Sequence, residues 1–176
     1  MKTNLRLLTA TAIGIALFVV LSLMLQVPVF QNYYLCLGYV AMAVYCYSFG
    51  AFSGTAVGAL GVFLYCLITS GMRGMPGWAL GNVVIGIGLG LSFARSKKLK
   101  PAPLQLAVEA GAIILFTAVG ILGVKSLVDS FIRSQPFLVR AGMNMSAFIA
   151  DAAVLLLSLP ICRLLDPYAK KLLKQQ

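Results

Sequence analysis

The sequence alternates long apolar segments with short polar ones, and six of the apolar segments carry almost no charged residues. Each approaches the ~20 residues that a helix needs to cross about 30 Å of hydrocarbon. Runs of this length predict membrane-spanning helices. The expected helices lie near residues 6–26, 33–48, 52–69, 77–94, 103–125 and 139–163.

Turn-forming residues separate these segments. Pro28 ends the first predicted helix, Gly50 and Ser53 mark a tight turn before the third, and residues 71–76 separate the third from the fourth. Residues 126–135 are amphipathic and are expected to lie at the membrane interface. The pattern predicts an all-α membrane protein, a six-transmembrane-helix bundle, in which residues 1–176 form a single integral-membrane domain.

Composition supports this class. Hydrophobic residues make up 61% of the 176 positions and charged residues only 10%, against about 25% charged in a typical soluble domain. A water-soluble fold of this length could not bury so much apolar surface. The formal net charge of +10 would suggest nucleic-acid binding in a soluble domain. In a membrane protein it is typical of helix flanks on the cytoplasmic face, so we expect a lipid bilayer and no nucleic acid as partner.

Positive charge is divided unevenly between the two sides of the predicted bundle. One side comprises the N-terminus, the loop after the fourth helix and the C-terminal tail, and holds Lys2, Arg6, Arg95, Lys97, Lys98, Lys100, Arg163, Lys170, Lys171 and Lys174. The other side holds Arg73, Lys125, Arg133 and Arg140. Cytoplasmic loops carry the excess of Lys and Arg, so both termini are expected in the cytoplasm of a bacterial cell, around a multi-pass protein of its inner (plasma) membrane.

The sequence lacks the residues of the commonest catalytic and metal sites. It contains no His, which excludes His-based triads and the commonest metal ligand. Its four Cys form no C-x-x-C pair and are expected to be packing residues. Residues 120–126 are faintly similar to a phosphate-binding loop but lack the Gly directly before the Lys. We therefore expect no enzyme activity, no cofactor, no metal and no unaided use of ATP.

Polar residues inside the predicted helices are costly in lipid, which makes them functional candidates. The sixth predicted helix carries a polar stripe with spacings of four, three and four residues, on one helix face: Arg140, Asn144, Ala147 and Asp151. The fourth carries a second stripe with a spacing of four residues: Trp78, Asn82, Gly86 and Gly90. An aromatic ring, an amide and glycines would provide a stacking wall, a hydrogen-bonding group and space beside the backbone.

Both stripes begin at the outer ends of their helices. If they converge with the other polar residues at that end, they line a largely apolar pocket that opens outward and binds a small molecule. The candidate substrate-binding residues are Trp78, Asn82, Asn144, Arg140, Asp151, Tyr33, Tyr34 and Arg73. In a structural alternative, the amides and Asp151 only bond across helices, and Trp78 and the tyrosines form an interfacial belt.

Small residues recur at helical spacing in three of the predicted helices. They are Ala12 and Ala16 in the first, Gly50, Gly54 and Gly58 in the third, and Gly86 and Gly90 in the fourth. In lipid, such faces let helix backbones approach closely. For the third and fourth helices we expect internal packing of the bundle.

A series of short motifs occurs in order between residues 27 and 91. They are Val27-Pro28, Tyr33-Tyr34-Leu35-Cys36-Leu37-Gly38, Phe49-Gly50-Ala51-Phe52-Ser53-Gly54, Gly58-Ala59-Leu60-Gly61 and Pro76-Gly77-Trp78-Ala79-Leu80-Gly81-Asn82. Through the order and spacing of these motifs, the chain resembles the substrate-binding S components of energy-coupling-factor (ECF) vitamin transporters. Within that family it is most similar to the riboflavin-type branch, which includes hydroxymethylpyrimidine and pyridoxine carriers.

The resemblance implies the substrate-specificity subunit of an ECF ABC-type importer, which captures a vitamin or vitamin precursor from outside. It implies a ligand held by the first, third and fifth loops and helices four to six, and ATP-driven uptake with a transmembrane coupling (T) subunit and two cytoplasmic ATPase subunits. In this family an A-x-x-x-A face of the first helix docks on the coupling subunit, and Ala12 and Ala16 match it. One Trp with amides suits a small heteroaromatic alcohol, such as hydroxymethylpyrimidine or pyridoxine, better than a polyanion such as folate. The first loop, residues 28–32, is short for a lid.

Two alternatives from other classes remain. The chain could be a stand-alone proton-coupled secondary transporter or small channel that uses Asp151 as its proton relay. It could also be a membrane assembly protein without transport activity. An S component should co-purify with coupling and ATPase subunits, whereas a secondary carrier should work alone on a proton gradient.

Overall fold

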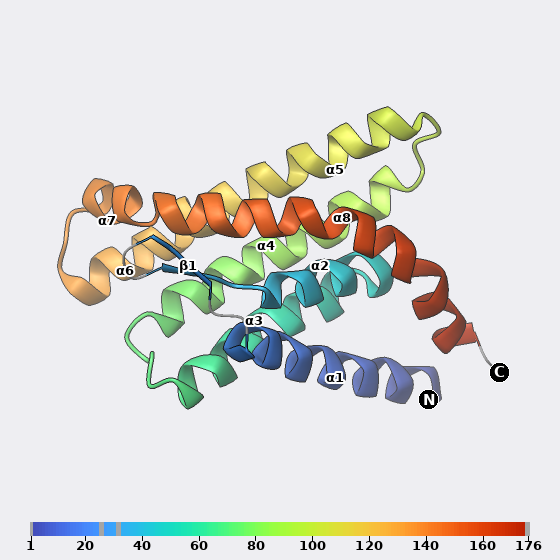
Figure 1. Ribbon diagram of the computed structural model, residues 1–176, viewed down its shortest axis with the longest axis horizontal. Coiled ribbons are helices and arrows are strands. Elements are labelled where there is room, and N and C mark those ends of the chain that lie inside the picture. The colour runs from blue at the N-terminus through green and yellow to red at the C-terminus, as the bar shows by residue number, and fades with distance from the viewer. Residues whose placement is uncertain (1, 25–26, 31–32, 175–176) are drawn as a thin grey trace.

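The structure is a computed structural model that describes residues 2–24, 27–30 and 33–174 (Figure 1). Helices make up most of the described chain, and a short hairpin of two strands follows the first helix. The elements in chain order are α1 (Lys2–Met24), β1 (Val27–Phe30), β2 (Tyr33–Leu35), α2 (Gly38–Phe49), α3 (Ala51–Ile68), α4 (Met75–Ser96), α5 (Ala102–Thr117), the π-helix η1 (Ala118–Lys125), α6 (Ser126–Arg133), α7 (Phe137–Met143) and α8 (Met145–Lys174).

Five stretches of the described chain are long and apolar enough to cross a membrane. They are Leu5–Met24, Ala51–Ile68, Met75–Ser96, Ala102–Arg133 and Met145–Lys171. The remaining apolar helix, α2, has 12 residues and is therefore about 18 Å long at 1.5 Å per residue, well short of the hydrocarbon thickness. The structure thus supports a mainly helical membrane bundle: among the described residues, five spans have full length, and α2 is a short central helix.

A β-hairpin occupies the start of the second predicted helix. β1 and β2 pair antiparallel, with Val27 opposite Leu35 and Pro28 opposite Tyr34. The helix predicted over residues 33–48 therefore begins only at Gly38. The two tyrosines at the start of this segment favour extended backbone, which explains the difference.

The fifth predicted helix does not end at residue 125. It continues through η1 into α6, and only there does Ser134, in the left-handed conformation with φ 50°, end it. Ser126 and Asp129 are buried, so the amphipathic segment turns its polar face into the bundle. The prediction that residues 126–135 lie at the membrane interface overlooked that a polar helix face can also be covered by protein.

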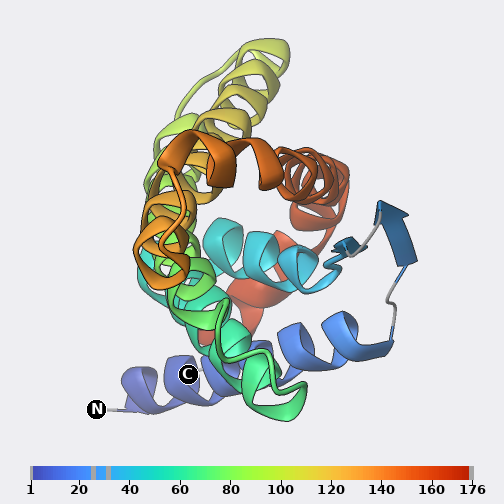
Figure 2. The same ribbon diagram turned by 90° about the vertical axis from the view of Figure 1, so that its left-hand side faces the viewer.

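Different segments of the chain form the two ends of the bundle. Figure 1 shows the N- and C-terminal ends of the described chain at the same end of the bundle as the loop between α4 and α5; we call this the termini end. The β-hairpin, the α3–α4 turn and the α6–α7 turn lie at the opposite end, the hairpin end. Seen from the hairpin end, α2 lies in the middle of the other helices (Figure 2), and most of its residues are buried.

Glycines bring α3 and α4 into backbone contact. A Cβ atom at Gly86 would lie 2.6 Å from the Thr55 Cα, and one at Gly90 would overlap Ala51. On the other side of α3, Gly54 packs against the Cys46 backbone. The predicted internal packing of these helices is confirmed. α3 occupies the space beside Gly86 and Gly90 of the α4 stripe, so this space is not available to a ligand, contrary to expectation.

Charged side chains form ion pairs and hydrogen bonds at the termini end of the bundle. Glu109 is fully buried and accepts hydrogen bonds from Ser96 and Gln105, both at 2.9 Å, while Arg163 of α8 forms an ion pair with it at 2.8 Å. Lys97 pairs with Asp166 at 2.8 Å. The ionic partner of Glu109 is thus an arginine of α8 and not a lysine of the neighbouring α4–α5 loop.

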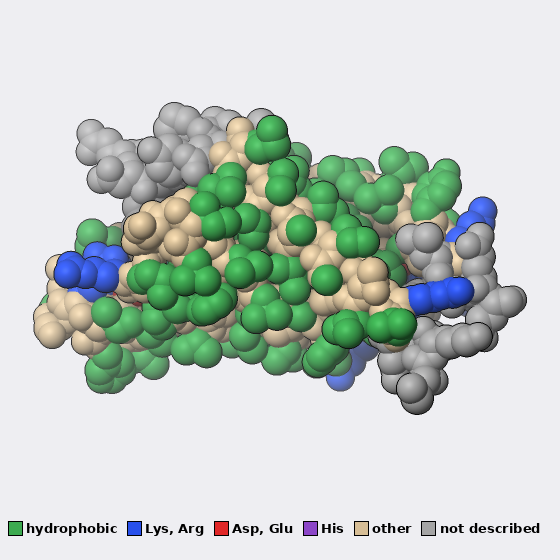
Figure 3. Space-filling view, turned by 90° about the horizontal axis from the view of Figure 1, so that it is seen from below, with side chains coloured by type: hydrophobic (Ala, Val, Ile, Leu, Met, Phe, Trp, Pro, Cys, Tyr) green, Lys and Arg blue, Asp and Glu red, His purple; other side chains and the backbone are tan. Residues whose placement is uncertain are grey.

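The outer surface fits a lipid environment. Hydrophobic side chains cover the middle of the face seen in Figure 3, and Lys and Arg lie toward its two ends. Many of the exposed side chains of the described spans are large and apolar, among them Leu17, Leu64 and Ile87. A belt of this kind is stable only in contact with hydrocarbon.

Candidate functional site

A chain of hydrogen bonds joins the α4 stripe to α2 and α3 at the hairpin end. The Trp78 indole Nε1 donates to the Tyr39 hydroxyl at 2.9 Å, and that hydroxyl donates to the Asn82 Oδ1 at 2.8 Å. The Asn82 amide in turn donates to the Gly58 carbonyl at 3.0 Å. Tyr39 and Asn82 are fully buried, and Trp78 is half-buried with its ring edge-on to Tyr65. The indole ring is therefore held in one orientation.

A second set of bonds joins the end of η1 to α6 and to α7 with its C-cap residue Asn144. Lys125 donates to the Asn144 Oδ1 at 2.5 Å, and the Asn144 amide donates to the Ser126 hydroxyl at 2.9 Å. The Asp129 carboxylate pairs with Arg140 at 3.2 Å and with Lys125 at 3.6 Å. Burying charges without water is costly unless they are paired, so these contacts keep the three helices together.

Asp151 of α8 lies between the two sets. Its side chain is buried and interacts with the Tyr39 hydroxyl and with the charge of Lys125. The result is one continuous group of polar side chains inside the hairpin end. We call it the polar network: Tyr39, Trp78, Asn82, Lys125, Ser126, Asp129, Arg140, Asn144 and Asp151.

The backbone of η1 and its packing against α4 position the network residues at the start of α6. η1 packs against α4 through glycines, since a Cβ at Gly81 would lie 2.7 Å from the Gly120 carbonyl oxygen. The wide π-helical turn is followed by Ser126, whose hydroxyl donates to the Ile121 carbonyl at 2.9 Å. Single π-helical turns are frequent at functional sites. Here the turn precedes the charged residues of α6 that enter the bundle.

The structure brings together five of the eight predicted site residues. Trp78, Asn82, Asn144, Arg140 and Asp151 all belong to the polar network. Arg73 is exposed in the turn between α3 and α4 and is not part of it. The backbone of Tyr33 and Tyr34 forms β2, and the placement of their side chains lies outside what the structure describes.

Four residues of the network were not predicted. Lys125 and Asp129 form an i,i+4 pair of opposite charge, and this spacing inside an apolar stretch was a usable signal. Ser126, next to Lys125, gave none by itself. Tyr39 lies in an aromatic, apolar run, where a functional hydroxyl cannot be told from a packing residue.

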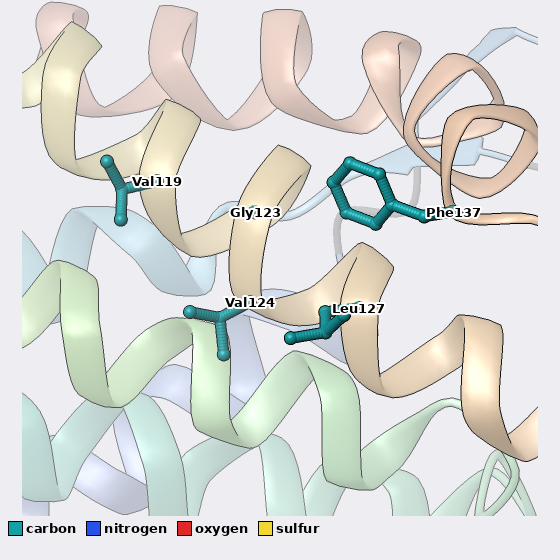
Figure 4. Close-up of a pocket in the computed structure, with 5 residues that line it drawn as sticks. All are labelled: Val119, Gly123, Val124, Leu127 and Phe137. Carbon is teal, nitrogen blue, oxygen red and sulfur yellow. The ribbon is translucent and has the colours of Figure 1, made fainter.

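An apolar groove lies on the same end of the molecule. It has a volume of about 300 Å³ and is lined by Val119, Gly123, Val124, Leu127 and Phe137 (Figure 4). Val119, Leu127 and Phe137 are partly exposed, so the groove opens on the outer surface. Small-molecule sites combine apolar walls with a few directed polar groups. The polar network, and not this groove, supplies such groups.

The chain is similar to known proteins over nearly its whole length. The family model of the ECF-type riboflavin transporter, S component, matches residues 2–166. UPF0397 protein str0306 of Streptococcus thermophilus (strain CNRZ 1066) is 28% identical over 170 residues, which cover 90% of this chain and 92% of that protein. A UPF0397 protein of Streptococcus thermophilus (strain ATCC BAA-491 / LMD-9) is 33% identical over 92 residues, 52% of this chain and 50% of its own length. The chain belongs to the family of the ECF-type riboflavin transporter S component.

Proposed function

We propose that this chain captures hydroxymethylpyrimidine or pyridoxine from outside the cell for ATP-driven uptake. Membership of the S component family makes it a multi-pass protein of the bacterial plasma membrane and a substrate-binding subunit of an ECF importer. S components work with a T subunit and ATPase subunits and bind small vitamins. The identity of the vitamin is our proposal.

The polar network carries the proposal. Buried polar groups in a membrane protein are costly, and they mark functional sites. The network combines an oriented indole ring with the Asn82 and Asn144 amides, which suits a flat heteroaromatic ring with hydrogen-bonding substituents. Its charges are already paired internally, since Lys125 and Arg140 both contact Asp129. A neutral ligand suits this balance better than a polyanion.

We further propose that the hairpin end faces outward and the termini end faces the cytoplasm. The segments that hold most of the Lys and Arg all meet at the termini end (Figure 1), and cytoplasmic loops carry the excess of these residues. The polar network would then lie in the outer half of the membrane, where it can meet a ligand from outside.

The α1 face with Ala12 and Ala16 is our candidate for docking on the T subunit. Both alanines are exposed, whereas Gly14 on the opposite face packs against Tyr45 and Val57. Exposed small side chains in a span allow another helix backbone to approach closely. The two ATPase subunits would supply the nucleotide chemistry for which this sequence has no phosphate-binding motif.

Two measurements on the purified full-length chain test the ligand. Native mass spectrometry should find a small molecule retained by the protein. Titration calorimetry with hydroxymethylpyrimidine, pyridoxine and riboflavin should then show the tightest binding for one of the first two. Tightest binding of riboflavin would keep the S component assignment and replace the proposed vitamin.

A transport assay separates an importer from a secondary carrier. In proteoliposomes, uptake should require co-reconstituted T and ATPase subunits and hydrolysable ATP. Uptake by the chain alone, driven by a proton gradient and abolished by Asp151→Asn, would favour the secondary carrier.

A further inference from the structure

Two atoms of one buried ion pair have no hydrogen-bond partner among the described residues. They are the Asp129 Oδ1 and the Arg140 Nε. The side chains are well enclosed, since Asp129 is 1% exposed and Arg140 is 5% exposed. The other carboxylate oxygen, Oδ2, already accepts from Arg140 and contacts Lys125. Leaving such groups unpaired inside a protein is costly, so their pairing needs an explanation.

The chemistry of the two atoms restricts what can pair with both. The carboxylate oxygen only accepts hydrogen bonds, and the guanidinium N–H only donates. An anionic group would satisfy Arg140 but meet the negative charge of Asp129. A cationic group would satisfy Asp129 but face Arg140 and Lys125. A hydroxyl donates through its hydrogen and accepts through its oxygen, so it is a neutral group that matches both kinds of atom.

The position of the unpaired oxygen places it beside the proposed binding residues. A Cβ atom at Gly77 would lie 2.7 Å from the Asp129 Oδ1, so this oxygen lies against the first turn of α4. Trp78, whose indole is held by Tyr39, is the next residue. The unpaired oxygen therefore lies against the residue that precedes Trp78 on α4.

We propose that Asp129 and Arg140 form a subsite for an alcohol hydroxyl of the ligand. This inference rests on the proposed function, because it takes the polar network as the vitamin site. It applies equally to hydroxymethylpyrimidine, pyridoxine and riboflavin, since all three carry alcohol groups. The subsite is therefore a statement about which chemical group is recognised, independent of which of these vitamins is bound.

The test compares matched ligands in matched variants. Calorimetry measures the affinity of the full-length chain for whichever of the three vitamins it binds and for the analogue with a methyl group in place of the alcohol-bearing substituent. We expect the parent protein to prefer the alcohol by about tenfold or more, the size of effect that follows when a buried polar group is left unpaired. In the double variant Asp129→Leu with Arg140→Met, the ratio of the affinity for the alcohol to the affinity for the methyl analogue should fall to about one.

The double variant is chosen so that the protein still folds. Removing Asp129 and Arg140 together is less disruptive than removing either one alone, which strands a buried charge. Lys125, the other cation beside Asp129, keeps its hydrogen bond to the Asn144 Oδ1. The matched control, Lys97→Met with Asp166→Leu, removes an ion pair at the termini end and should keep the parent ratio. The affinity ratio also does not depend on the fraction of active protein.

A second pair of variants keeps every charge. Gly77→Ala places a methyl group against the Asp129 Oδ1 and should lower the preference for the alcohol, while Gly74→Ala, with nothing within 4 Å of the new Cβ, should not. Equal preference in the parent and the Asp129/Arg140 double variant would overturn the subsite but leave the proposed function standing. Failure of the parent to bind any of the three vitamins or retain any hydroxyl-bearing ligand would overturn both.

Discussion

The Tyr39 hydroxyl makes two hydrogen bonds in the core of the hairpin end. It accepts from Trp78 and donates to Asn82, and it lies beside Asp151. In a buried core, a hydroxyl with two partners restricts the orientation of both, because an alternative orientation breaks one of these hydrogen bonds. Tyr39 therefore positions two of the residues that we propose to contact the ligand.

A conservative change at this residue tests its positioning role. Tyr39→Phe keeps the ring but leaves the Trp78 indole and the Asn82 carbonyl oxygen without this partner, which should destabilise the protein by about 1–3 kcal/mol. Thermal unfolding in detergent should show a lower midpoint, and ligand affinity should fall as well. Tyr168→Phe, at an exposed position of α8, is the matched control and should leave both unchanged.

The ligand-contacting role of the polar network predicts losses at three positions. Trp78→Ala removes a stacking surface, and Asn82→Leu and Asn144→Leu each remove a directed hydrogen bond. Each change should weaken ligand binding about tenfold or more, since the loss of a buried hydrogen bond costs about 1–3 kcal/mol. Calorimetry of the purified variants measures this.

Thr69→Val serves as the control for that series. Thr69 is exposed, and among the described residues its hydroxyl bonds to the Tyr65 carbonyl of its own helix, so its loss should leave affinity unchanged. Parent-like binding by all three network variants would mean that the network is structural and that the ligand binds elsewhere.

At the scale of the elements, close contact between α3 and α4 forms the wall on which the site is built. Gly86→Ala would push a methyl group to 2.6 Å from the Thr55 backbone, so the two helices must separate. Overpacking of this kind costs about 1–3 kcal/mol. A lower thermal midpoint is the expected result.

Gly111→Ala is a matched change in a neighbouring helix. A Cβ at Gly111 meets nothing within 4 Å, so alanine there should stabilise α5 slightly through its higher helix propensity. An unchanged midpoint for Gly86→Ala would show that the α3–α4 contact is looser than the structure has it.

The elements also show what sequence can and cannot predict here. Apolar runs of membrane length determine where the long helices lie, because lipid demands internal backbone hydrogen bonding. The same apolar character led to the prediction of a helix at Tyr33, Tyr34 and Leu35, which form a strand. An aromatic run fits a strand as well as a helix. Residues 126–135 were misplaced because periodicity identifies a polar helix face but not what covers it. In this fold α7 brings Arg140 onto that face.

At the scale of the whole molecule, opposite faces have different tasks. One face of α1 packs into the bundle through Gly14 and Phe18, while Ala12 and Ala16 point outward. If the outward face docks on a T subunit, Ala12→Leu with Ala16→Leu should abolish ATP-driven uptake in the reconstituted complex while leaving the ligand affinity of the isolated chain intact.

The control for docking places the same side chains elsewhere on the lipid-facing surface. Ala94→Leu with Ala107→Leu adds two leucines at exposed positions of α4 and α5 and should leave uptake normal. Normal uptake by the Ala12/Ala16 variant would contradict the docking assignment. Loss of ligand affinity in that variant would show that α1 supports the binding site itself.

Trp78 is the only tryptophan of the chain, and its indole is anchored by Tyr39 inside the polar network. The intrinsic tryptophan fluorescence of the unlabelled protein therefore originates at a single point, next to the proposed ligand. A change in polarity or hydrogen bonding at that point alters the emission directly, without background from other indoles. The protein thus carries its own optical probe, and the binding of a vitamin can be followed in real time, in detergent or in a bilayer, without chemical modification.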